Sequence, residues 1–254
     1  MGNNLWVAFS GWYLVLLDIL LIIGITCFLR LSGEKKASIF YWLPFLILSF
    51  TVFYENIGAY TLYDLEFRKA ANAYLGNTEY PLYNLWVFNI TNSQILTVLY
   101  LSLIRFWLSQ SKKKYLTRMI LFFVIFVVVI QLTGIEPIYL NQPFILAVGT
   151  YLILFGCGLY FIELMAQERF LKSNLLRLIS FWQMTLIFFN YSLSYSYSIS
   201  FEYLYGINPE LTKSLAIVNQ TMGILCLFIF VVTIASPFLP INFEREPNHE
   251  SSIT

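Results

Sequence analysis

Long apolar segments recur along the whole chain and are separated by short polar connections. A helix needs roughly 20 apolar residues to cross the hydrocarbon core of a bilayer. Seven segments approach or exceed this length: 5–29, 39–60, 85–108, 119–134, 144–165, 175–194 and 215–237. The fourth is the shortest, and Leu116 or Ile138–Leu140 would extend it. The sequence therefore predicts an all-α polytopic membrane protein, with seven transmembrane helices in residues 1–238 and a short tail over 239–254.

The composition agrees with this class of protein. Hydrophobic residues make up 59% of the chain and charged residues 11%, against about 25% charged in a soluble domain. A net charge of +1 with dispersed basic residues excludes a nucleic-acid partner. The single histidine, His249, lies in the polar tail, so we expect no haem, no metal and no other cofactor. Cys27, Cys157 and Cys226 lie in apolar segments, and we interpret them as packing residues.

Basic residues concentrate in alternate connections, which indicates the orientation of the chain. Eleven of the fifteen lysines and arginines fall in or beside the first, third and fifth connections. They are Arg30, Lys35, Lys36, Arg105, Lys112, Lys113, Lys114, Arg118, Arg169, Lys172 and Arg177. Short loops rich in lysine and arginine remain on the cytoplasmic side. The sequence therefore predicts that the amino terminus lies outside and the carboxyl-terminal tail in the cytoplasm.

Two other stretches predict local structure. The second connection, 62–81, contains a segment over 63–74 that predicts a short surface helix ended by Gly76–Asn77, and such a helix would cover an outer cavity. Serine and tyrosine nearly alternate over 191–200. This pattern fits either the frayed outer end of the sixth segment or an irregular polar rim.

Polar side chains gather at one depth in the outer half of the predicted bundle. They are Glu55, Asn56, Asn89, Asn92, Gln131, Asn190, Asn219 and Gln220. One interpretation is an outward-facing cavity lined by amides, a carboxylate and aromatic rings, suited to a small neutral or cationic ligand. The other is that these groups hydrogen-bond one another and hold the helices together. Under the first interpretation, Glu55→Gln and Asn190→Leu abolish ligand binding.

Two further acids lie within the apolar segments. Asp18, near the middle of the first, is either a proton-carrying site or a carboxyl group bonded to a neighbouring helix. Glu163, near the cytoplasmic end of the fifth, is expected to pair with the basic loop around Arg169. Basic residues of the third connection would contact anionic lipid or dock a cytoplasmic partner. These residues are Arg105, Lys112, Lys113, Lys114 and Arg118.

Comparison with known seven-span proteins narrows the possibilities. The last segment holds no lysine, which a retinal protein requires, and Ile104 stands before Arg105 where rhodopsin-like receptors carry an acid. Segments 55–60, 84–89 and 181–182 resemble those of uncharacterised seven-span membrane proteins of the Bacteroidetes type. The resemblance implies a multi-pass protein of a bacterial inner membrane and implies no activity.

We expect a receptor-like sensor that binds a small ligand from outside and relays to a cytoplasmic partner. A small-solute transporter or channel is the alternative, which predicts polar groups continuing into the inner half. That half is apolar in the sequence apart from Asp18, Gln183 and Glu163. An intramembrane enzyme is a third possibility. The chain shows no recognisable catalytic motif, so an enzyme would have to use a carboxylate pair such as Asp18 with Glu55.

Overall fold

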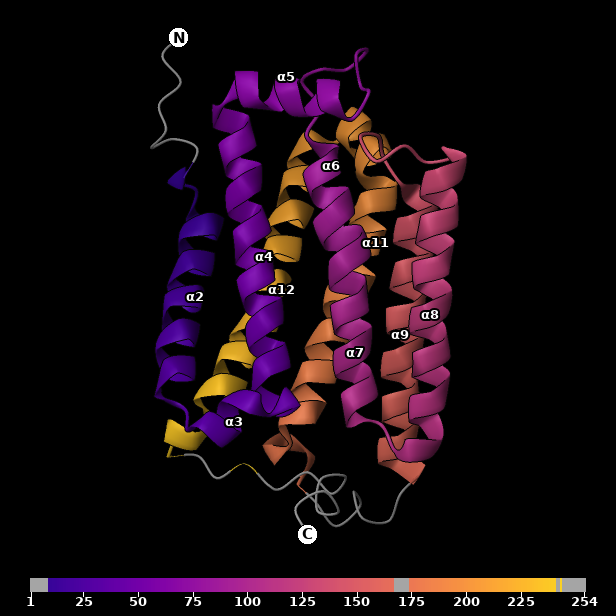
Figure 1. The fold of residues 1–254 in the computed structure, drawn as a ribbon. Helices are drawn as coiled ribbons and strands as arrows, with labels where there is room; N and C mark the ends of the chain where they lie inside the picture. The colour runs from indigo at the N-terminus through magenta and orange to yellow at the C-terminus, as the bar shows by residue number, and fades with distance from the viewer. Residues whose placement is uncertain (1–8, 167–173, 241–242, 244–254) are drawn as a thin grey trace.

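The computed structural model describes residues 9–166, 174–240 and 243, and the regular elements within them are all helices. Long helices run up and down along one axis in a single bundle (Figure 1). Six described segments are long and apolar enough to cross a membrane. They are α2 (Trp12–Arg30), α4 (Ile39–Tyr63), Leu85–Trp107, α8 (Gln110–Thr133), α9 (Pro143–Ala166) and Pro209–Phe238, which opens with α12 (Pro209–Ala235).

A seventh long helix, α11 (Ile179–Ile207), runs through the bundle beside them. Its 29 residues are enough to cross a bilayer. It is not among the segments with the hydropathy of a membrane span, because serines, tyrosines and amides interrupt its apolar residues. The serine- and tyrosine-rich stretch 191–200 is regular helix within α11.

The third crossing segment changes its winding along its length. It begins as α6 (Leu85–Phe88), continues as the π-helix η1 (Asn89–Leu96) and ends as α7 (Thr97–Trp107). A π-helix widens the turn to i→i+5 hydrogen bonds, and such turns occur frequently at functional sites. No feature of the sequence pattern predicted this change.

The fourth crossing helix begins much earlier than its apolar residues. α8 starts at Gln110, with Ser109 at its N-cap, so Lys112–Lys114 form part of its first turns. Leu116 is fully buried inside it. At the other end Gly134 takes a left-handed φ of 68° and closes the helix, so Ile138–Leu140 fall in the following loop.

Short helices lie at the two ends of the bundle. α3 (Gly33–Ala37) lies at the lower end of Figure 1, and α5 (Leu65–Tyr74) lies across the upper end. α5 matches the surface helix predicted over 63–74. Asp64 caps it by accepting a 2.9 Å hydrogen bond from the Phe67 N–H, and this bond lowers the pKa of Asp64 below its usual value. The 3₁₀ turns η2 (Leu175–Arg177) and η3 (Ser236–Phe238) precede α11 and follow α12.

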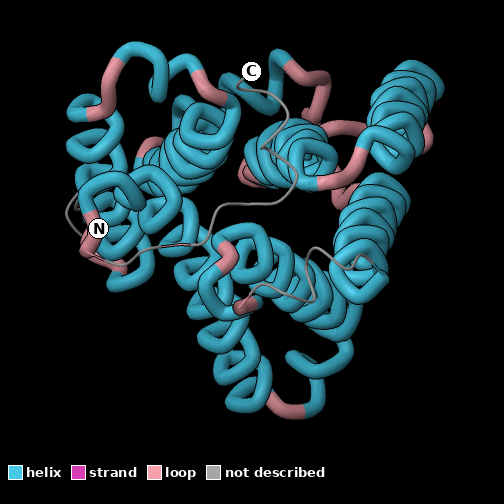
Figure 2. Tube along the Cα trace, turned by 90° about the horizontal axis from the view of Figure 1, so that it is seen from below, coloured by secondary structure: helices cyan, strands magenta, loops and turns pink. Residues whose placement is uncertain are grey.

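The long helices pack in two groups. α12 packs against α2, α4 and α11, while α7, α8 and α9 pack against one another. α11 joins the groups by also contacting α9, and α4 joins them by contacting η1 and α7. Figure 2, which views the molecule from its lower end, shows the helices end-on around the bundle axis. Residues of both groups, such as Leu48, Leu101 and Phe230, form one continuous buried core.

The outer surface of the bundle is apolar, as expected of helices in lipid. Ile22 on α2, Leu121 and Leu132 on α8, and Phe144 on α9 are all more than half exposed. Gly24 allows α2 to approach α4 closely, since a Cβ there would lie 2.5 Å from Leu48 Cδ2. Small residues at such contacts are typical of membrane helices, where packing rather than burial from water drives association.

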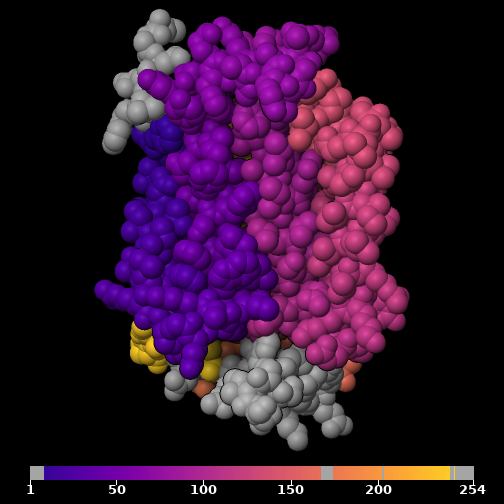
Figure 3. Space-filling model, viewed as in Figure 1, coloured from indigo at the N-terminus to yellow at the C-terminus, as the bar shows by residue number. Residues whose placement is uncertain are grey.

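Charged residues divide between the two ends of the bundle. Lys35 and Lys36 in α3 and Lys112–Lys114 at the start of α8 lie at the lower end of Figure 1, and Asp64 and Glu66 lie at the upper end beside α5. In the space-filling view of Figure 3, α5 and its flanking loop cover the top of the visible face. The first crossing helix begins at Trp12; residues 1–8 and most of the tail lie outside the described residues.

Candidate functional site

Glu55 on α4 lies in the upper half of the bundle beside two tyrosines. The Tyr13 hydroxyl, from α2, donates a 3.4 Å hydrogen bond to Glu55 Oε1. Tyr54, which is 9% exposed, lies near enough to interact electrostatically with this carboxyl group. Tyr13 and Glu55 themselves are half-buried. The carboxyl group that the sequence singled out therefore has local partners and no basic residue bonded to it among the described residues.

Two more helices reach this point of the bundle. Gly223, on α12, presents a small surface here: a Cβ on it would lie 3.7 Å from the Tyr13 hydroxyl and 3.8 Å from Asn190 Oδ1. Asn190 belongs to α11. The structure therefore brings Glu55 and Asn190 into one neighbourhood together with Tyr13, which the sequence analysis did not select. We call Tyr13, Tyr54, Glu55 and Asn190 the Glu55 cluster.

Asn219 takes part in a contact between α11 and α12. The Ser194 hydroxyl donates a 2.8 Å hydrogen bond to Asn219 Oδ1. Both residues are half-buried, as is Gln220 beside Asn219. Ser194 and Asn219 each lie about one turn from Asn190 and Gly223, toward the upper end of the bundle. This bond joins α11, which carries Asn190, to α12, which carries Gly223.

Asn56 has hydrogen-bond partners outside the Glu55 cluster, one of them on α2. Its amide donates 2.9 Å hydrogen bonds to Asp18 Oδ1 and to the Val52 carbonyl. Asp18 is half-buried on α2. Asp18 and Glu55 thus have different partners. The Asp18 carboxyl group is bonded to a neighbouring helix, as one of the two sequence interpretations proposed.

Asn89 serves a loop rather than the Glu55 cluster. Its side chain is 2% exposed and donates hydrogen bonds of 2.8 and 2.6 Å to the Ile138 and Leu140 carbonyls. These bonds pin the α8–α9 connection to η1. Asn92 lies one turn further along η1 and is half-buried.

Gln131 lies on the far side of the bundle from Glu55. It belongs to α8, which packs against α7 and α9. Its Nε2 atom is buried and has no hydrogen-bond partner among the described residues. The polar residues that the sequence placed at one level therefore fall into separate places. Glu55 and Asn190 lie near each other, while Asn56, Asn89 and Gln131 contact other parts of the bundle.

Two buried tyrosines and a buried cysteine lie between the Glu55 cluster and the middle of the bundle. The rings of Tyr100 and Tyr191 meet edge to face at 5.1 Å. The Tyr100 hydroxyl lies 3.9 Å from Cys226 Sγ. All three side chains are at most 8% exposed, and Tyr54 lies near enough to interact electrostatically with both Tyr100 and Tyr191. We call Tyr100, Tyr191 and Cys226 the central cluster.

Sequence reasoning missed the central cluster because it selected amides and acids as polar residues and interpreted the cysteines as packing residues. A usable signal was present. Tyr100 is four residues from Leu96 and seven from Trp107, all on one stripe of the third crossing segment and all nearly fully buried. A tyrosine on such a stripe faces other helices rather than the interface.

Polar contacts continue into the lower half of the bundle. The Trp107 indole N–H donates a 2.7 Å hydrogen bond to Gln183 Oε1, and Gln183 Nε2 donates a 2.8 Å hydrogen bond to Thr233 Oγ1. The Tyr160 and Ser180 hydroxyls lie 2.6 Å apart. These side chains are at most 2% exposed. The expectation that the lower half is apolar apart from three residues was wrong, because tryptophan, tyrosine and threonine supply its polar atoms.

The basic residues of the third connection differ in their surroundings. Lys112 is half-buried against α9. Its Nζ lies 3.8 Å from Glu163 Oε2 and donates a 3.1 Å hydrogen bond to the Leu159 carbonyl. Glu163 also accepts hydrogen bonds from Ser109, so it fixes the start of α8. Its expected partner, Arg169, lies outside the described residues.

The remaining basic residues lie nearer the surface at the lower end. Arg105 is exposed and bonds Thr117 through a 2.8 Å contact. Lys114 and Arg118 are exposed and one turn apart on α8, and Lys113 is half-buried. These residues, rather than Lys112, are available to an anionic surface.

The Glu55 cluster combines hydrogen-bond acceptors with aromatic rings. A carboxyl group beside phenol rings suits a small cation, through charge and through cation–π contacts. Among the described residues, no group of three or more His, Cys, Asp or Glu side chains is placed to hold a metal ion. No protein-family model matches the chain, and neither the curated proteins nor the solved structures contain a significant match to it.

Proposed function

We propose that the chain is a receptor-like sensor of seven membrane-spanning helices, with α11 as the less apolar seventh. Its amino terminus and α5 lie outside, and the ends rich in lysine and arginine lie in the cytoplasm of a bacterial cell. The observation that carries the proposal is the meeting of Tyr13, Glu55 and Asn190 around Gly223, where four helices contribute to one polar neighbourhood.

The ligand that best fits this neighbourhood is a small organic cation. Glu55 supplies negative charge or a strong acceptor, Tyr13 and Tyr54 supply ring faces and hydroxyls, and Asn190 supplies an amide. Aromatic rings around a quaternary ammonium ion stabilise it by cation–π attraction of about 0.5–2 kcal/mol for each well-placed ring. Inside a membrane these contacts replace the hydration that the cation loses.

The buried polar line supports a relay toward the cytoplasm. Tyr54 connects the Glu55 cluster to the central cluster, whose Tyr100 follows η1 on the third crossing segment. That segment ends at Trp107, next to the connection that leads to Lys114 and Arg118. A ligand that favours one arrangement of these contacts over another would shift the lower end of α7.

Ligand binding by the purified protein in lipid nanodiscs tests the proposal. Tetramethylammonium is the probe, and neopentyl alcohol is its neutral counterpart of similar shape. We expect tetramethylammonium to raise the unfolding temperature of the wild-type protein and neopentyl alcohol to leave it unchanged. Glu55→Gln and Asn190→Leu should remove the shift. Gln131→Leu, on the other side of the bundle, is the matched control and should keep it.

Equal shifts with the cation and the alcohol, or a full shift in Glu55→Gln, would remove the Glu55 cluster as the binding site. For the cytoplasmic half of the proposal, Lys114→Glu with Arg118→Glu should abolish docking of a cytoplasmic partner while leaving tetramethylammonium binding intact. Retained docking in that variant would place the partner surface elsewhere.

A transporter is the second candidate, favoured by the Trp107–Gln183–Thr233 contacts in the lower half. Uptake of radiolabelled methylammonium into proteoliposomes distinguishes it from a sensor. A transporter gives saturable uptake that falls in Gln183→Leu, and a sensor gives none. Trp107 and Gln183 are buried in the lower half, which favours the sensor.

A further inference from the structure

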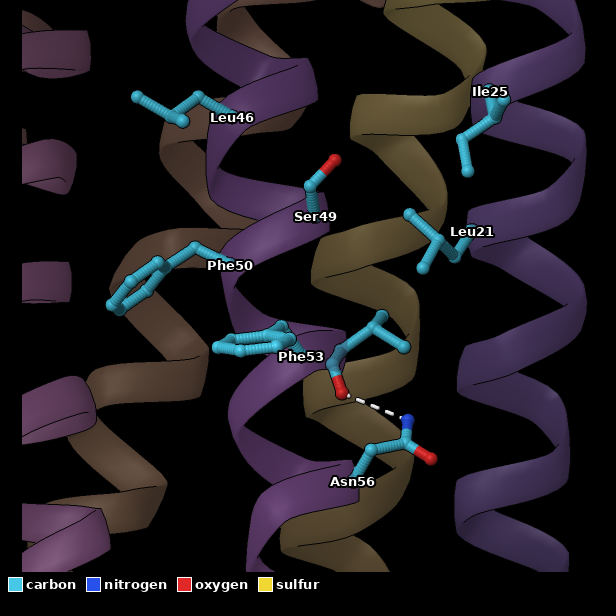
Figure 4. A pocket seen from close by; sticks show the side chains of 8 residues that line it. Leu21, Ile25, Leu46, Ser49, Phe50, Phe53 and Asn56 are labelled. Atoms are coloured by element: carbon cyan, nitrogen blue, oxygen red, sulfur yellow. Dashed lines mark hydrogen bonds between the residues drawn. The ribbon is translucent and has the colours of Figure 1, made fainter.

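A groove of about 470 Å³ runs between α2 and α4 on the outer surface of the bundle. Its walls are apolar: Leu21 and Ile25 project from α2, and Leu46, Phe50 and Phe53 from α4 (Figure 4). Phe53 is 61% exposed, so the groove opens sideways, toward the region that lipid occupies. Its volume falls in the range of about 300–1,000 Å³ that is typical of small-molecule sites.

Polar atoms lie at one end of this groove. Asn56 lines it, and the Asn56 amide bonds Asp18 Oδ1 at 2.9 Å. Asp18, Leu21 and Ile25 share one face of α2 at helical spacing. The Asn56 N–H groups are donated to Asp18 and to the Val52 carbonyl. The polar atoms left at this end are therefore oxygens: the Asn56 carbonyl oxygen, which lines the groove, and the Asp18 carboxyl group next to it, which borders the groove.

These oxygens lack a positive partner. No lysine or arginine of the described residues forms an ion pair with Asp18. Ser49 Oγ, on the same wall, points into the groove in Figure 4 and is buried with no hydrogen-bond partner among the described residues. An acidic group at membrane depth is costly and marks a functional position by default. The chemistry that complements an acid and an amide oxygen is a cationic hydrogen-bond donor.

We propose that the groove binds a single-chain amphiphile with a primary ammonium headgroup, which enters from the bilayer between α2 and α4. The ammonium group donates hydrogen bonds to Asp18 and to the Asn56 carbonyl oxygen. The hydrocarbon chain lies along Leu21, Phe53 and Ile25 toward Leu46. The site uses a different acid and a different helix face from the Glu55 cluster, so it does not rest on the proposed sensor function.

The headgroup determines the selectivity of this site. Lipid tails are as apolar as the groove walls, so moving a hydrocarbon chain from bilayer to groove gains little free energy. A charge-assisted hydrogen bond in a low dielectric gains much more. Chains of equal length should therefore bind according to their headgroups, with ammonium strongest, hydroxyl weaker and carboxylate weakest.

Photo-crosslinking in phosphatidylcholine nanodiscs tests this order. The probe is a long-chain primary amine with a diazirine in its alkyl chain, and dodecylamine, dodecanol and dodecanoate compete with it. We expect labelling of peptides from α2 and α4, and we expect dodecylamine to compete at least tenfold more strongly than dodecanol. Asp18→Asn should remove that preference. Leu21→Trp should fill the groove and abolish labelling, and Ile23→Trp, on the opposite, lipid-facing side of α2, should leave it unchanged.

Three results would overturn the proposal. One is equal competition by dodecylamine and dodecanol in the wild-type protein. Another is an unchanged amine preference in an Asp18→Asn protein that melts like the wild type. The third is a crosslink from Phe53 to a second copy of the chain that excludes the amine, since the groove would then be an interface between copies. Tetramethylammonium binding at Glu55 should survive Leu21→Trp, which keeps this test separate from that of the sensor.

Discussion

The Trp107 indole N–H donates a 2.7 Å hydrogen bond to Gln183 Oε1 in the lower half of the bundle, where both side chains are at most 2% exposed. Gln183→Leu removes the acceptor of Trp107 and the donor to Thr233. Leaving such groups unpaired costs about 1–3 kcal/mol, and interhelical bonds in membranes fall toward the lower end. We expect a loss of about 1–2 kcal/mol, measured by unfolding in mixed micelles.

Thr185 provides the matched control on the same helix. Its hydroxyl is buried and has no hydrogen-bond partner among the described residues, so Thr185→Val removes an uncompensated polar atom at nearly constant volume. We expect Thr185→Val to leave stability unchanged or to raise it by up to about 1 kcal/mol. If Thr185→Val destabilised the protein as much as Gln183→Leu, the Trp107–Gln183 bond would have no special role.

Asn89→Leu should loosen the α8–α9 connection. The substitution removes both hydrogen bonds to the Ile138 and Leu140 carbonyls and leaves those carbonyls without their donor. We expect a loss of stability of about 1–3 kcal/mol and faster hydrogen exchange in the connection. Asn92→Leu, one turn away on η1, should have a clearly smaller effect. Equal effects of the two substitutions would contradict the pinning role of Asn89.

Gly24→Ala tests the close approach of α2 and α4. The added Cβ meets Leu48 Cδ2 at 2.5 Å, so Leu48 must move or the helices must separate. Overpacking of this kind costs about 1–3 kcal/mol. Because the clash is with the end of a side chain, Gly24→Ala combined with Leu48→Ala should lose less stability than the sum of the two single losses, and the double-mutant cycle should show a favourable coupling. Strictly additive losses would show that the two side chains do not meet.

Acid should loosen α5. The Phe67 N–H and the Tyr60 hydroxyl bond the Asp64 carboxylate and lower its pKa. A group whose pKa is lower in the folded state stabilises that state above its unfolded pKa, about 3.9 for aspartate. This stability is lost as pH falls through the lowered folded value. We expect proteolysis within α5 to accelerate below about pH 4 in the wild-type protein. Asp64→Asn should be protease-sensitive at every pH, and a pH-independent wild type would exclude the cap.

Hydropathy predicted several helices well because apolar length is what a bilayer requires. The ends expected for residues 39–60, 85–108 and 144–165 agree to within a few residues with α4, the third crossing segment and α9. It failed at the start of α8, where Ser109 stands at the N-cap, bonded to Glu163, and the first turns of the helix are basic. Hydropathy measures what lipid tolerates, and helix ends are set by hydrogen bonds.

The sequence predicted the level of the candidate site residues along the bundle axis, but it did not predict which of them lie close together. Sequence position placed Glu55, Asn89, Gln131 and Asn190 at one level, but which helices are neighbours is a property of packing between distant segments. The structure joins Glu55 with Asn190 through Tyr13 and Gly223, and it assigns Asn89 to a loop. Tyr13 carried no signal of its own, since a tyrosine near a helix end is ordinary in any membrane protein.

The π-helix η1 has a mechanical consequence for the chain below it. Each residue taken up by a wide turn offsets every later side chain by about 100° around the helix axis, the angle per residue of an α-helix. Tightening η1 would therefore rotate Tyr100 out of its contact with Cys226 and move Arg105 around the axis of α7 at the lower end of the bundle. A small rewinding of η1 in the upper half of the bundle would thus displace side chains of α7 far below it.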